Sequence, residues 1–298
     1  MIIFVNGQYV NAKHAVISPY DHGYLYGLGV FETFRIYEGH PFLFNDHYNR
    51  LNRAVRELNI SWSMSKEEVL AVLEELLERN DLRNAYVRFN VSAGVGEIGL
   101  QTEEYTSPTT IVFIKSLPVQ DEVIEKTGVI LKQTRNTPEG MFRLKSHHYL
   151  NNILGKREIG ADPDQEGIFL TKEGHVAEGI VSNVFFVKDR RLCTPSLETG
   201  ILNGITREFV LCMAETYGIQ SNVGLFTEDD LFTSEEVFVT NSIQEIVPIK
   251  QIGDVVYKGK QGEITSFLAQ EYKVYRKTLW KNDELKGMNT LGSAKHQV

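Results

Sequence analysis

The sequence has few cysteines and no long apolar segment. Only two of its 298 residues are cysteines, Cys193 and Cys212, too few for a disulfide framework or a zinc site of their own. We expect both to be small core residues of a cytoplasmic protein. No apolar run approaches the roughly 20 residues of a membrane-spanning helix, and residues 1–7 have neither the basic region nor the cleavage site of a signal peptide. The start of the chain therefore predicts a strand, and no membrane binding is expected.

The sequence also lacks a basic surface stripe and the commonest catalytic motifs. The formal net charge is -8 and the lysines and arginines are scattered, which argues against nucleic-acid binding and favours a small-molecule substrate. There is no P-loop, no His-Glu-x-x-His helix, no Cys-x-x-Cys pair and no Gly-x-Ser-x-Gly elbow. The usual nucleotide, zinc and serine-hydrolase sites are therefore not predicted. Adjacent His147 and His148 would point in different directions on a helix, so no metal site is predicted there either.

The length of the chain allows two domains, each with its own core. We predict a smaller α/β domain at residues 1–117, a linker at 118–122 and a larger domain at 123–280. Consecutive short turns in the second half are typical of a largely antiparallel sheet or barrel, so the fold class predicted is α+β. Residues 281–298 are polar, without periodicity, and are expected to form a tail.

In the first half, Asn6-Gly7 and Glu38-Gly39 each lie between two apolar-rich runs and predict hairpins. Asn45 is a plausible N-cap of a helix on which Arg50 lies at the edge of the buried face. Ser65 opens a second helix through a capping box. Residues 85–92 alternate between apolar and polar side chains, so one face of that strand either meets solvent or lines a polar site.

In the second half, Lys145 stands where a strand-like run gives way to a helix whose apolar face is predicted to be Leu150, Ile153 and Leu154. Glu178 lies in a predicted long strand, residues 176–187. A further helix begins after Gly204, and its first N–H groups and its dipole favour an anion. Every helix has such an end, so this signal is weak alone.

The segments around Lys145 (142–152) and Glu178 (176–184) resemble those of the fold-type IV pyridoxal-phosphate enzymes. This family holds branched-chain and D-amino acid aminotransferases and aminodeoxychorismate lyase. The resemblance runs from about residue 4 to about residue 249. It implies pyridoxal 5'-phosphate as cofactor, a two-domain fold and a homodimer.

The resemblance also implies roles for individual residues. Lys145 would bind the cofactor covalently and move a proton, work that suits a lysine whose pKa is lowered by desolvation. Glu178 would hold the proton of the pyridine nitrogen. The phosphate would be bound by Arg50, Ser242 and the main chain of Ile205 and Thr206, with Leu202 against the ring and Tyr149 near its hydroxyl.

The reaction is predicted from longer similarities. Residues 136–140, 142–150 and 21–35 are most similar to the bacillus type of aminodeoxychorismate lyase, which makes 4-aminobenzoate and pyruvate for folate biosynthesis. The alternative is a branched-chain or D-amino acid aminotransferase. Tyr86 and Arg88 are similar to residues of the branched-chain enzymes. The family's D-amino acid aminotransferases carry a carboxylate-binding arginine where this chain has Ala93, which argues against that activity.

Substrate contacts follow from the same resemblance. The side chains expected to hold the substrate carboxylates are Arg35, Tyr86 and Arg88, because guanidinium groups bind carboxylates in a bidentate manner. Thr33 is a second candidate, after Lys145, for the acid that protonates the leaving fragment. A non-enzymatic binding protein on the same fold is the remaining alternative.

Overall fold

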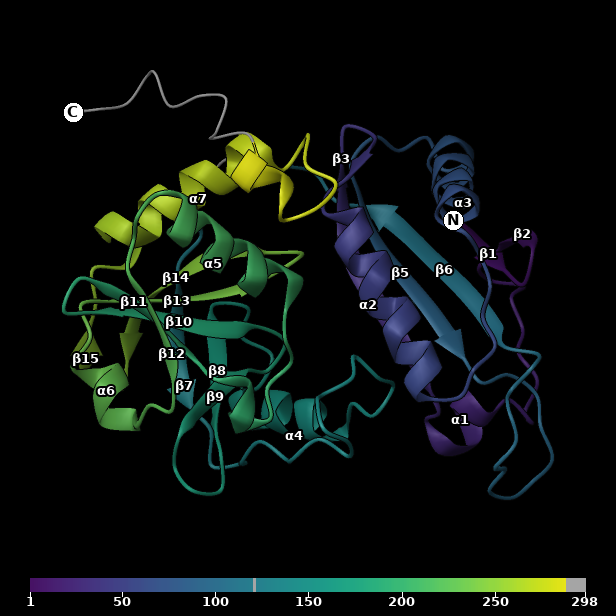
Figure 1. The fold of residues 1–298 in the computed structure, drawn as a ribbon, viewed down its shortest axis with the longest axis horizontal. Coiled ribbons are helices and arrows are strands. Elements are labelled where there is room, and N and C mark those ends of the chain that lie inside the picture. The colour runs from purple at the N-terminus through teal and green to yellow at the C-terminus, as the bar shows by residue number, and fades with distance from the viewer. Residues whose placement is uncertain (120–121, 288–298) are drawn as a thin grey trace. The chain divides into compact units, whose positions relative to one another are not determined.

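A computed structural model describes residues 1–119 and 122–287 of the chain. Two residues of the predicted linker, 120 and 121, and residues 288–298 of the predicted tail lie outside the described residues. The chain divides into two compact units (Figure 1). The first unit is Met1–Val119 with Leu144–His148, and the second is Gln120–Arg143 with Tyr149–Val298. Each unit contains its own sheet.

The first unit is built on a six-stranded sheet whose strand order is β2-β1-β6-β5-β3-β4. All its pairs are antiparallel. The strands are β1 (Ile2–Val5), β2 (Gln8–Asn11), β3 (Gly29–Tyr37), β4 (His40–Pro41), β5 (Ala85–Ser92) and β6 (Thr109–Ser116). Both predicted hairpins are confirmed. Their turn residues, Asn6-Gly7 and Glu38-Gly39, all have positive φ, between 45° and 92°, which glycine adopts without strain.

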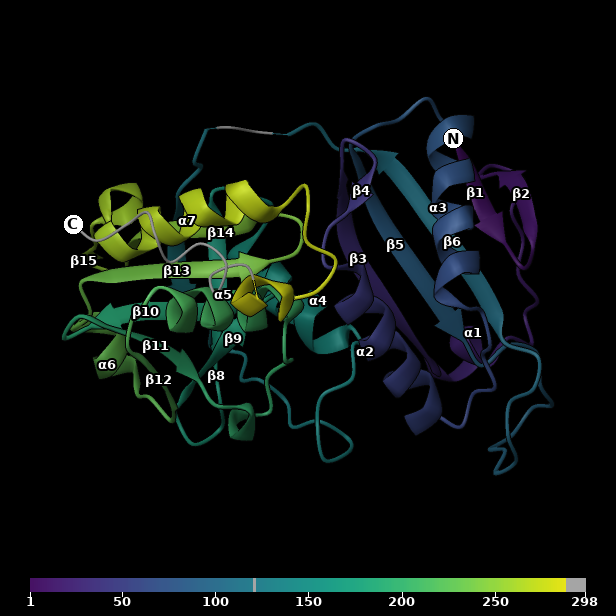
Figure 2. The same ribbon diagram turned by 45° about the horizontal axis from the view of Figure 1, so that its top comes forward.

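Three helices accompany this sheet: α1 (His22–Tyr26), α2 (Phe44–Glu57) and α3 (Lys66–Arg79). Figure 2 shows α2 and α3 lying against the strands. The capping box at Ser65 is confirmed. The predicted N-cap of α2 is wrong, because the helix begins at Phe44, two residues earlier than an N-cap at Asn45 implies. Its N-cap is Leu43, at φ 52° and without a side-chain cap bond. Packing of Phe44 against Phe34, with ring centroids 6.2 Å apart, fixes this start in place of a polar cap.

The segment Leu144–His148 belongs to the first unit although the sequence placed it within 123–280. The N–H of Phe31 donates to the Lys145 carbonyl oxygen, and the N–H of His147 donates to the Gly29 carbonyl oxygen, both at 2.9 Å. Val30 and Ser146 form an antiparallel bridge. The Gly29 end of β3 is not paired with β4, because β4 pairs only with Ile36 and Tyr37 at the other end of the strand. The segment therefore satisfies a strand edge that β4 leaves open.

The second unit is a closed barrel with extensions. Six strands follow one another in the order β10-β13-β14-β7-β8-β9, and β9 pairs again with β10 through Glu178 and Asn183. They are β7 (Lys126–Ile130), β8 (Gln165–Leu170), β9 (Val176–Gly179), β10 (Asn183–Lys188), β13 (Glu236–Asn241) and β14 (Glu245–Ile252). β11 (Arg191–Pro195) and β12 (Ser221–Gly224) extend it from β10, and β15 (Val255–Val256) pairs with β14. Most pairs are antiparallel, so the predicted α+β class with a barrel-like second half is confirmed.

The predicted strand 176–187 is two strands. Residues 180–182 form a turn in which the N–H of Gly179 donates to the carbonyl oxygen of Ser182 at 2.8 Å. β9 and β10 are both buried, apart from Lys188 at the end of β10, so the apolar run could not reveal the turn. Val184, Phe186 and Val239 pack in the barrel core. Cys193 and Cys212 are both buried, as predicted.

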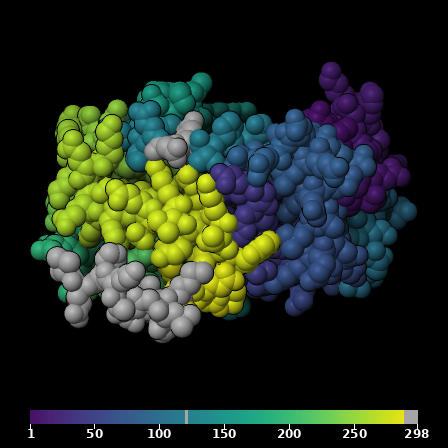
Figure 3. Space-filling model, turned by 90° about the horizontal axis from the view of Figure 1, so that it is seen from above, coloured from purple at the N-terminus to yellow at the C-terminus, as the bar shows by residue number. Residues whose placement is uncertain are grey.

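The helices of this unit are α4 (Leu150–Ile159), α5 (Ile205–Thr216), α6 (Glu228–Phe232) and α7 (Glu263–Tyr275), with 3-10 turns η1 (Leu197–Thr199) and η2 (Gly259–Gln261). Figure 3 shows the yellow C-terminal part of the chain at the surface. Within residues 1–119 and 122–287, no helix combines the length and the apolar character needed to span a membrane.

The apolar side of α4 is not its buried side. Leu150 is 67% exposed and Ile153 44%, whereas Asn152, Gly155 and Ile159 are buried. A Cβ on Gly155 would lie 2.6 Å from the Phe169 ring. The helix therefore approaches the barrel through a glycine, and an apolar count cannot detect such a face.

Candidate active site

Lys145 is held over an aromatic ring on β3. Its Nζ lies 4.8 Å from the centroid of the Phe31 ring, and the Arg88 guanidinium carbon lies 3.6 Å from the same centroid. Thr33 and Arg88 are directly paired across β3 and β5, so they share the face that carries Phe31. Within the first unit, the structure thus gathers Lys145, Thr33 and Arg88 on one face of the sheet.

The opposite face carries an ionic triad that the sequence did not predict. Glu32 on β3 is 2% exposed. Its Oε1 accepts from Arg50 Nε at 2.6 Å and its Oε2 accepts from Arg50 Nη2 at 2.7 Å. His47 Nδ1 lies 2.7 Å from the same Oε2. Arg50 and His47 come from α2, so the bidentate pair fixes the guanidinium of Arg50 against the sheet.

The charges in this triad are unequal. Burial alone would raise the pKa of Glu32, but the positive charge of Arg50 and the hydrogen bonds from Arg50 and His47 outweigh it, and the pKa falls to about 2. The pKa of His47 is lowered, because burial, reinforced by the positive charges of Arg50 and Lys145, outweighs the hydrogen bond and the charge of Glu32. At neutral pH the triad is therefore a carboxylate, a guanidinium and a neutral imidazole that donates to the carboxylate.

From the sequence, His147 was considered only as a possible metal ligand, and no metal site was predicted. Its ring stacks on Phe31, with centroids 6.2 Å apart and planes 29° apart. Burial, reinforced by the positive charge of Arg88, lowers the pKa of His147 to about 4. His147 is therefore a neutral neighbour of Lys145 at physiological pH. No sequence pattern would have revealed this, because Arg88 is distant in the chain.

Glu178 is a buried carboxylate held by cations and main chain. It is 4% exposed. Its Oε1 accepts from Arg135 Nε at 2.7 Å and lies 3.8 Å from Arg143 Nε. Its Oε2 accepts from the N–H of Leu202 at 3.0 Å. A carboxylate with these donors is fixed in orientation. The bond from Leu202 also holds residues 202–204, which lead into α5, beside Glu178.

Two arginines that the sequence did not predict support Glu178. Arg135 Nη1 donates to Asn151 Oδ1 on α4 at 2.6 Å, and Arg143 Nε donates to the Gly200 carbonyl oxygen at 2.5 Å. Burial, reinforced by Arg135, lowers the pKa of Arg143 to about 10. The only available signal was indirect: a buried carboxylate requires cationic partners.

The start of α5 carries the third group of predicted residues. Ile205 and Thr206 are its first two residues, and the N-cap is Gly204, which has no side chain to cap them. A Cβ on Gly204 would lie 2.1 Å from Asn183 Oδ1, which explains the glycine. The hydroxyls of Thr206 and Ser242 lie 3.2 Å apart. This arrangement of a helix start and two hydroxyls offers donors to an anion such as a phosphate.

Three more predicted site residues, Arg35, Tyr86 and Tyr149, have surroundings different from those of Lys145 and Glu178. Arg35 is 6% exposed, and its Nη2 donates to the carbonyl oxygens of Leu117 and Pro118 at 3.3 and 2.9 Å. Lys115 Nζ lies 4.7 Å from the centroid of the Tyr86 ring. Tyr149 precedes α4 as its N-cap residue.

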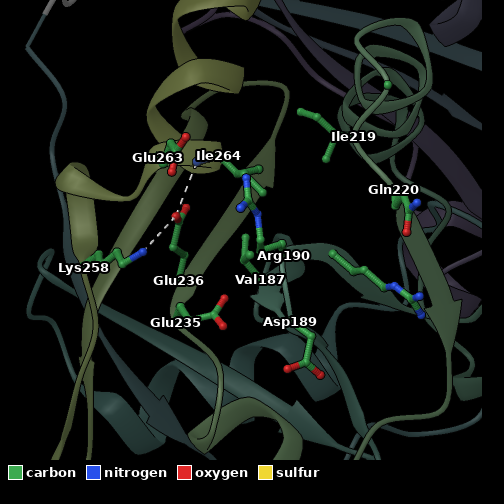
Figure 4. A pocket seen from close by; sticks show the side chains of 12 residues that line it. Val187, Asp189, Arg190, Ile219, Gln220, Glu235, Glu236, Lys258, Glu263 and Ile264 are labelled. Atoms are coloured by element: carbon green, nitrogen blue, oxygen red, sulfur yellow. Dashed lines mark hydrogen bonds and ion pairs between the residues drawn. The ribbon is translucent and has the colours of Figure 1, made fainter.

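A hollow elsewhere in the second unit does not contain any predicted site residue. Figure 4 shows it lined by side chains such as Arg190, Gln220 and Lys258. Inside it, the buried carboxylate of Glu236 accepts from the N–H of Thr265 at 2.9 Å and lies 3.9 Å from Lys258 Nζ. Glu236 therefore caps the start of α7, which is a structural role.

A comparison with protein-family models matches residues 29–252 to the family described as amino-transferase class IV. Among curated proteins, the aminodeoxychorismate lyase of Bacillus subtilis is 50% identical over 274 residues, covering 91% of this chain and 94% of that protein. A putative branched-chain-amino-acid aminotransferase of Methanocaldococcus jannaschii is 38% identical, covering 94% and 98%. Among solved structures, the branched-chain amino acid aminotransferase of Escherichia coli is 26% identical, with a TM-score of 0.83, and the match covers 92% of this chain and 94% of that one.

Proposed function

Because this chain belongs to the class IV amino-transferase family, we propose that it is a pyridoxal-phosphate-dependent lyase converting 4-amino-4-deoxychorismate to 4-aminobenzoate and pyruvate, a step of folate biosynthesis. The observation that carries this proposal is the 50% identity to the Bacillus subtilis lyase, which spans 91% of this chain and 94% of that protein. Identity to the putative branched-chain aminotransferase is lower, 38% over a similar span.

The residues of this chain fit the cofactor. When bound, pyridoxal phosphate supplies an electron-accepting ring that stabilises negative charge on the substrate carbon. We propose that Lys145 binds it covalently and that the fixed carboxylate of Glu178 holds the proton of its ring nitrogen. The uncapped helix start at Ile205 and Thr206, with the Ser242 hydroxyl 3.2 Å from that of Thr206, suits a phosphate. Arg50, Leu202 and Tyr149 are assigned to the cofactor by the resemblance.

Lys145 is the group that moves the proton. With pyridoxal phosphate bound, the free amine of Lys145 would remove the proton at the amino-bearing ring carbon of the substrate. The Phe31 ring under Nζ keeps the amine near the sheet and excludes water from one side. Aromatisation then expels the enolpyruvyl fragment, which needs a proton. Lys145 in its ammonium form supplies it, with the Thr33 hydroxyl as the second candidate.

Arg88 is the strongest candidate for holding a substrate carboxylate. It lies on the face that carries Phe31 and Thr33, and its Nε donates to a neutral amide, Asn90 Oδ1, at 3.0 Å. Tyr86 comes from the same strand face. Arg35 would have to share or exchange its two main-chain carbonyl partners to do the same. We therefore rank Arg88 before Tyr86 and Arg35.

A homodimer in the cytoplasm is the assembly and location that we propose. The family resemblance supports the dimer, and the exposed apolar side chains Leu150, Ile153 and Leu154 on α4 are suited to contact another chain. Two buried free cysteines, Cys193 and Cys212, suit a reducing compartment.

A paired product assay tests the reaction. The purified protein, loaded with pyridoxal phosphate, is given 4-amino-4-deoxychorismate, and 4-aminobenzoate and pyruvate are measured. In parallel it is given a branched-chain amino acid with 2-oxoglutarate, and glutamate is measured. We expect 4-aminobenzoate and pyruvate in equal amounts. Glutamate without 4-aminobenzoate would establish the second candidate, a branched-chain aminotransferase, which the similarity of Tyr86 and Arg88 favours.

Lys145→Ala tests the cofactor site. The variant should lose the absorbance band of lysine-bound cofactor and at least about a thousandfold in turnover, because both the covalent link and the proton carrier are removed. The matched control is Lys13→Ala, an exposed lysine of the same unit that is not assigned to the cofactor or the substrate. A Lys145→Ala protein that kept the band would disprove the assignment.

A further inference from the structure

A buried ion pair in the barrel has no role in the site described so far. Lys126 on β7 and Glu166 on β8 are 7% and 4% exposed, and Nζ lies 3.0 Å from Oε2. Taking two charges out of water costs free energy that their attraction often fails to recover. A buried pair of this kind therefore calls for an explanation other than stability.

The second oxygen of Glu166 holds the turn that follows Glu178. Oε1 accepts from Ser182 Oγ at 2.7 Å, and the Ser182 carbonyl oxygen accepts from the N–H of Gly179. A Cβ on Gly179 would lie 1.9 Å from Ser182 Oγ and 2.8 Å from Glu166 Oε1. The carboxylate, the hydroxyl and the glycine thus fit together, and Glu178 is the residue directly before this turn.

Lys126 reaches the turn that carries Ser242. Its Nζ lies 3.4 Å from Gln244 Oε1. This turn, residues 241–244, connects β13 to β14 and is organised by Asn241 Oδ1, which accepts from the N–H of Ile243 at 2.9 Å and of Gln244 at 2.7 Å. Ser242 lies within it, with its hydroxyl beside that of Thr206.

We propose that Lys126 and Glu166 form a positioning pair that holds the Glu178 carboxylate and the Ser242 hydroxyl at the mutual distance that one pyridoxal phosphate requires. The pair touches neither group directly; it acts through Ser182 on one side and through Gln244 on the other. This inference rests on the proposed function, because it assigns both turns to the same cofactor.

Two variants separate the two sides of the pair. In Lys126→Met/Glu166→Gln no charge stays buried without a partner. The ion pair and the bond to Gln244 are lost, while the amide introduced at position 166 can still accept from Ser182. In Ser182→Ala the ion pair and Gln244 are intact, and the turn after Glu178 is released. Glu236→Gln is the matched control, since Glu236 is a buried carboxylate at the far end of β13 that binds the start of α7.

Each variant is stripped of cofactor and titrated with pyridoxal phosphate, at a temperature at which circular dichroism shows all of them folded. The double variant should bind the cofactor about tenfold to a hundredfold more weakly, since small displacements of binding groups have effects of that size, with its absorbance band unmoved. Ser182→Ala should shift the band and the pH at which it titrates, and Ser182→Thr should restore both because it retains the hydroxyl.

The outcomes distinguish this proposal from the proposed function. If the unmodified protein binds no pyridoxal phosphate, the proposed function itself fails and the positioning role fails with it. If the unmodified protein binds the cofactor, but the double variant and Ser182→Ala both match Glu236→Gln in affinity and in band position, the pair is only structural and the inference is overturned.

Discussion

At the scale of single residues, Glu32 determines where the Arg50 guanidinium lies. We expect Glu32→Gln to weaken pyridoxal-phosphate binding about tenfold, because one bidentate bond is lost and Arg50 can then take other positions. Titration of the cofactor-free variant measures this. Glu75→Gln is the control, since its pair with Arg79 is half exposed and contributes little. Equal affinity of the two variants would show that Glu32 does not position Arg50 for the cofactor.

The same carboxylate links stability to pH. Its pKa is about 2 in the folded protein against an ordinary value of 4.5. Its contribution, about 3 kcal/mol, is therefore fully present above pH 4.5 and is lost as the pH falls toward 2. Urea unfolding at pH 6 and at pH 3 should show the difference between the unmodified protein and Glu32→Gln shrinking at the lower pH. A difference that stays constant would contradict the low pKa.

The pKa of His147 can be measured and reports on the immediate surroundings of Lys145. Its imidazole should titrate near pH 4 by NMR, because burial and Arg88 disfavour its charge. Arg88→Met should raise that pKa without restoring the ordinary 6.5, since burial, the larger cause, remains. The pH profile of turnover should then carry no contribution from His147 between pH 6 and 7. A titration near 6.5 in the unmodified protein would show that His147 is solvated.

At the scale of elements, the turn between β9 and β10 is tightly packed around Gly179. Gly179→Ala should destabilise the protein by about 2–4 kcal/mol, because the added Cβ would have to displace Ser182 and Glu166. Chemical denaturation measures this. Gly140→Ala is the control, since nothing lies within 4 Å of a Cβ there, and it should change stability by less than about 0.5 kcal/mol. Equal changes in the free energy of unfolding for Gly179→Ala and Gly140→Ala would mean that the turn can accommodate the added Cβ without strain.

Elements that depend on local pattern were predictable. Both hairpins of the first unit, the strand at 85–92 and the capping box at Ser65 rest on turn chemistry or two-residue alternation, and all are confirmed. Two features that depend on tertiary packing were not. The face of α4 is set by Gly155 against Phe169. The turn at 180–182 joins two strands that are buried almost throughout, so neither strand shows the two-residue alternation that would have marked its end.

At the scale of the whole molecule, resemblance identified the family, while the partners of the site residues required the structure. Lys145, Glu178 and Thr206 could be proposed as site residues from motifs. Glu32 beside Arg50 and Arg135 beside Glu178 could not, because each ion pair joins different elements whose proximity is set by the fold. The structure also places Leu144–His148 in the first unit, which neither composition nor linker signals indicated.

That placement has a consequence for the order of events during synthesis. The last strand of the first sheet ends at Ser116, yet the edge of β3 is completed only by residues 145–147. A ribosome needs about 2–6 s to add the intervening roughly 30 residues. For that interval the nascent chain exposes the unpaired backbone of Gly29 and Phe31 at a strand edge, the kind of surface that pairs with a neighbouring chain. Slower translation between codons 117 and 148 should therefore lower the yield of correctly folded protein.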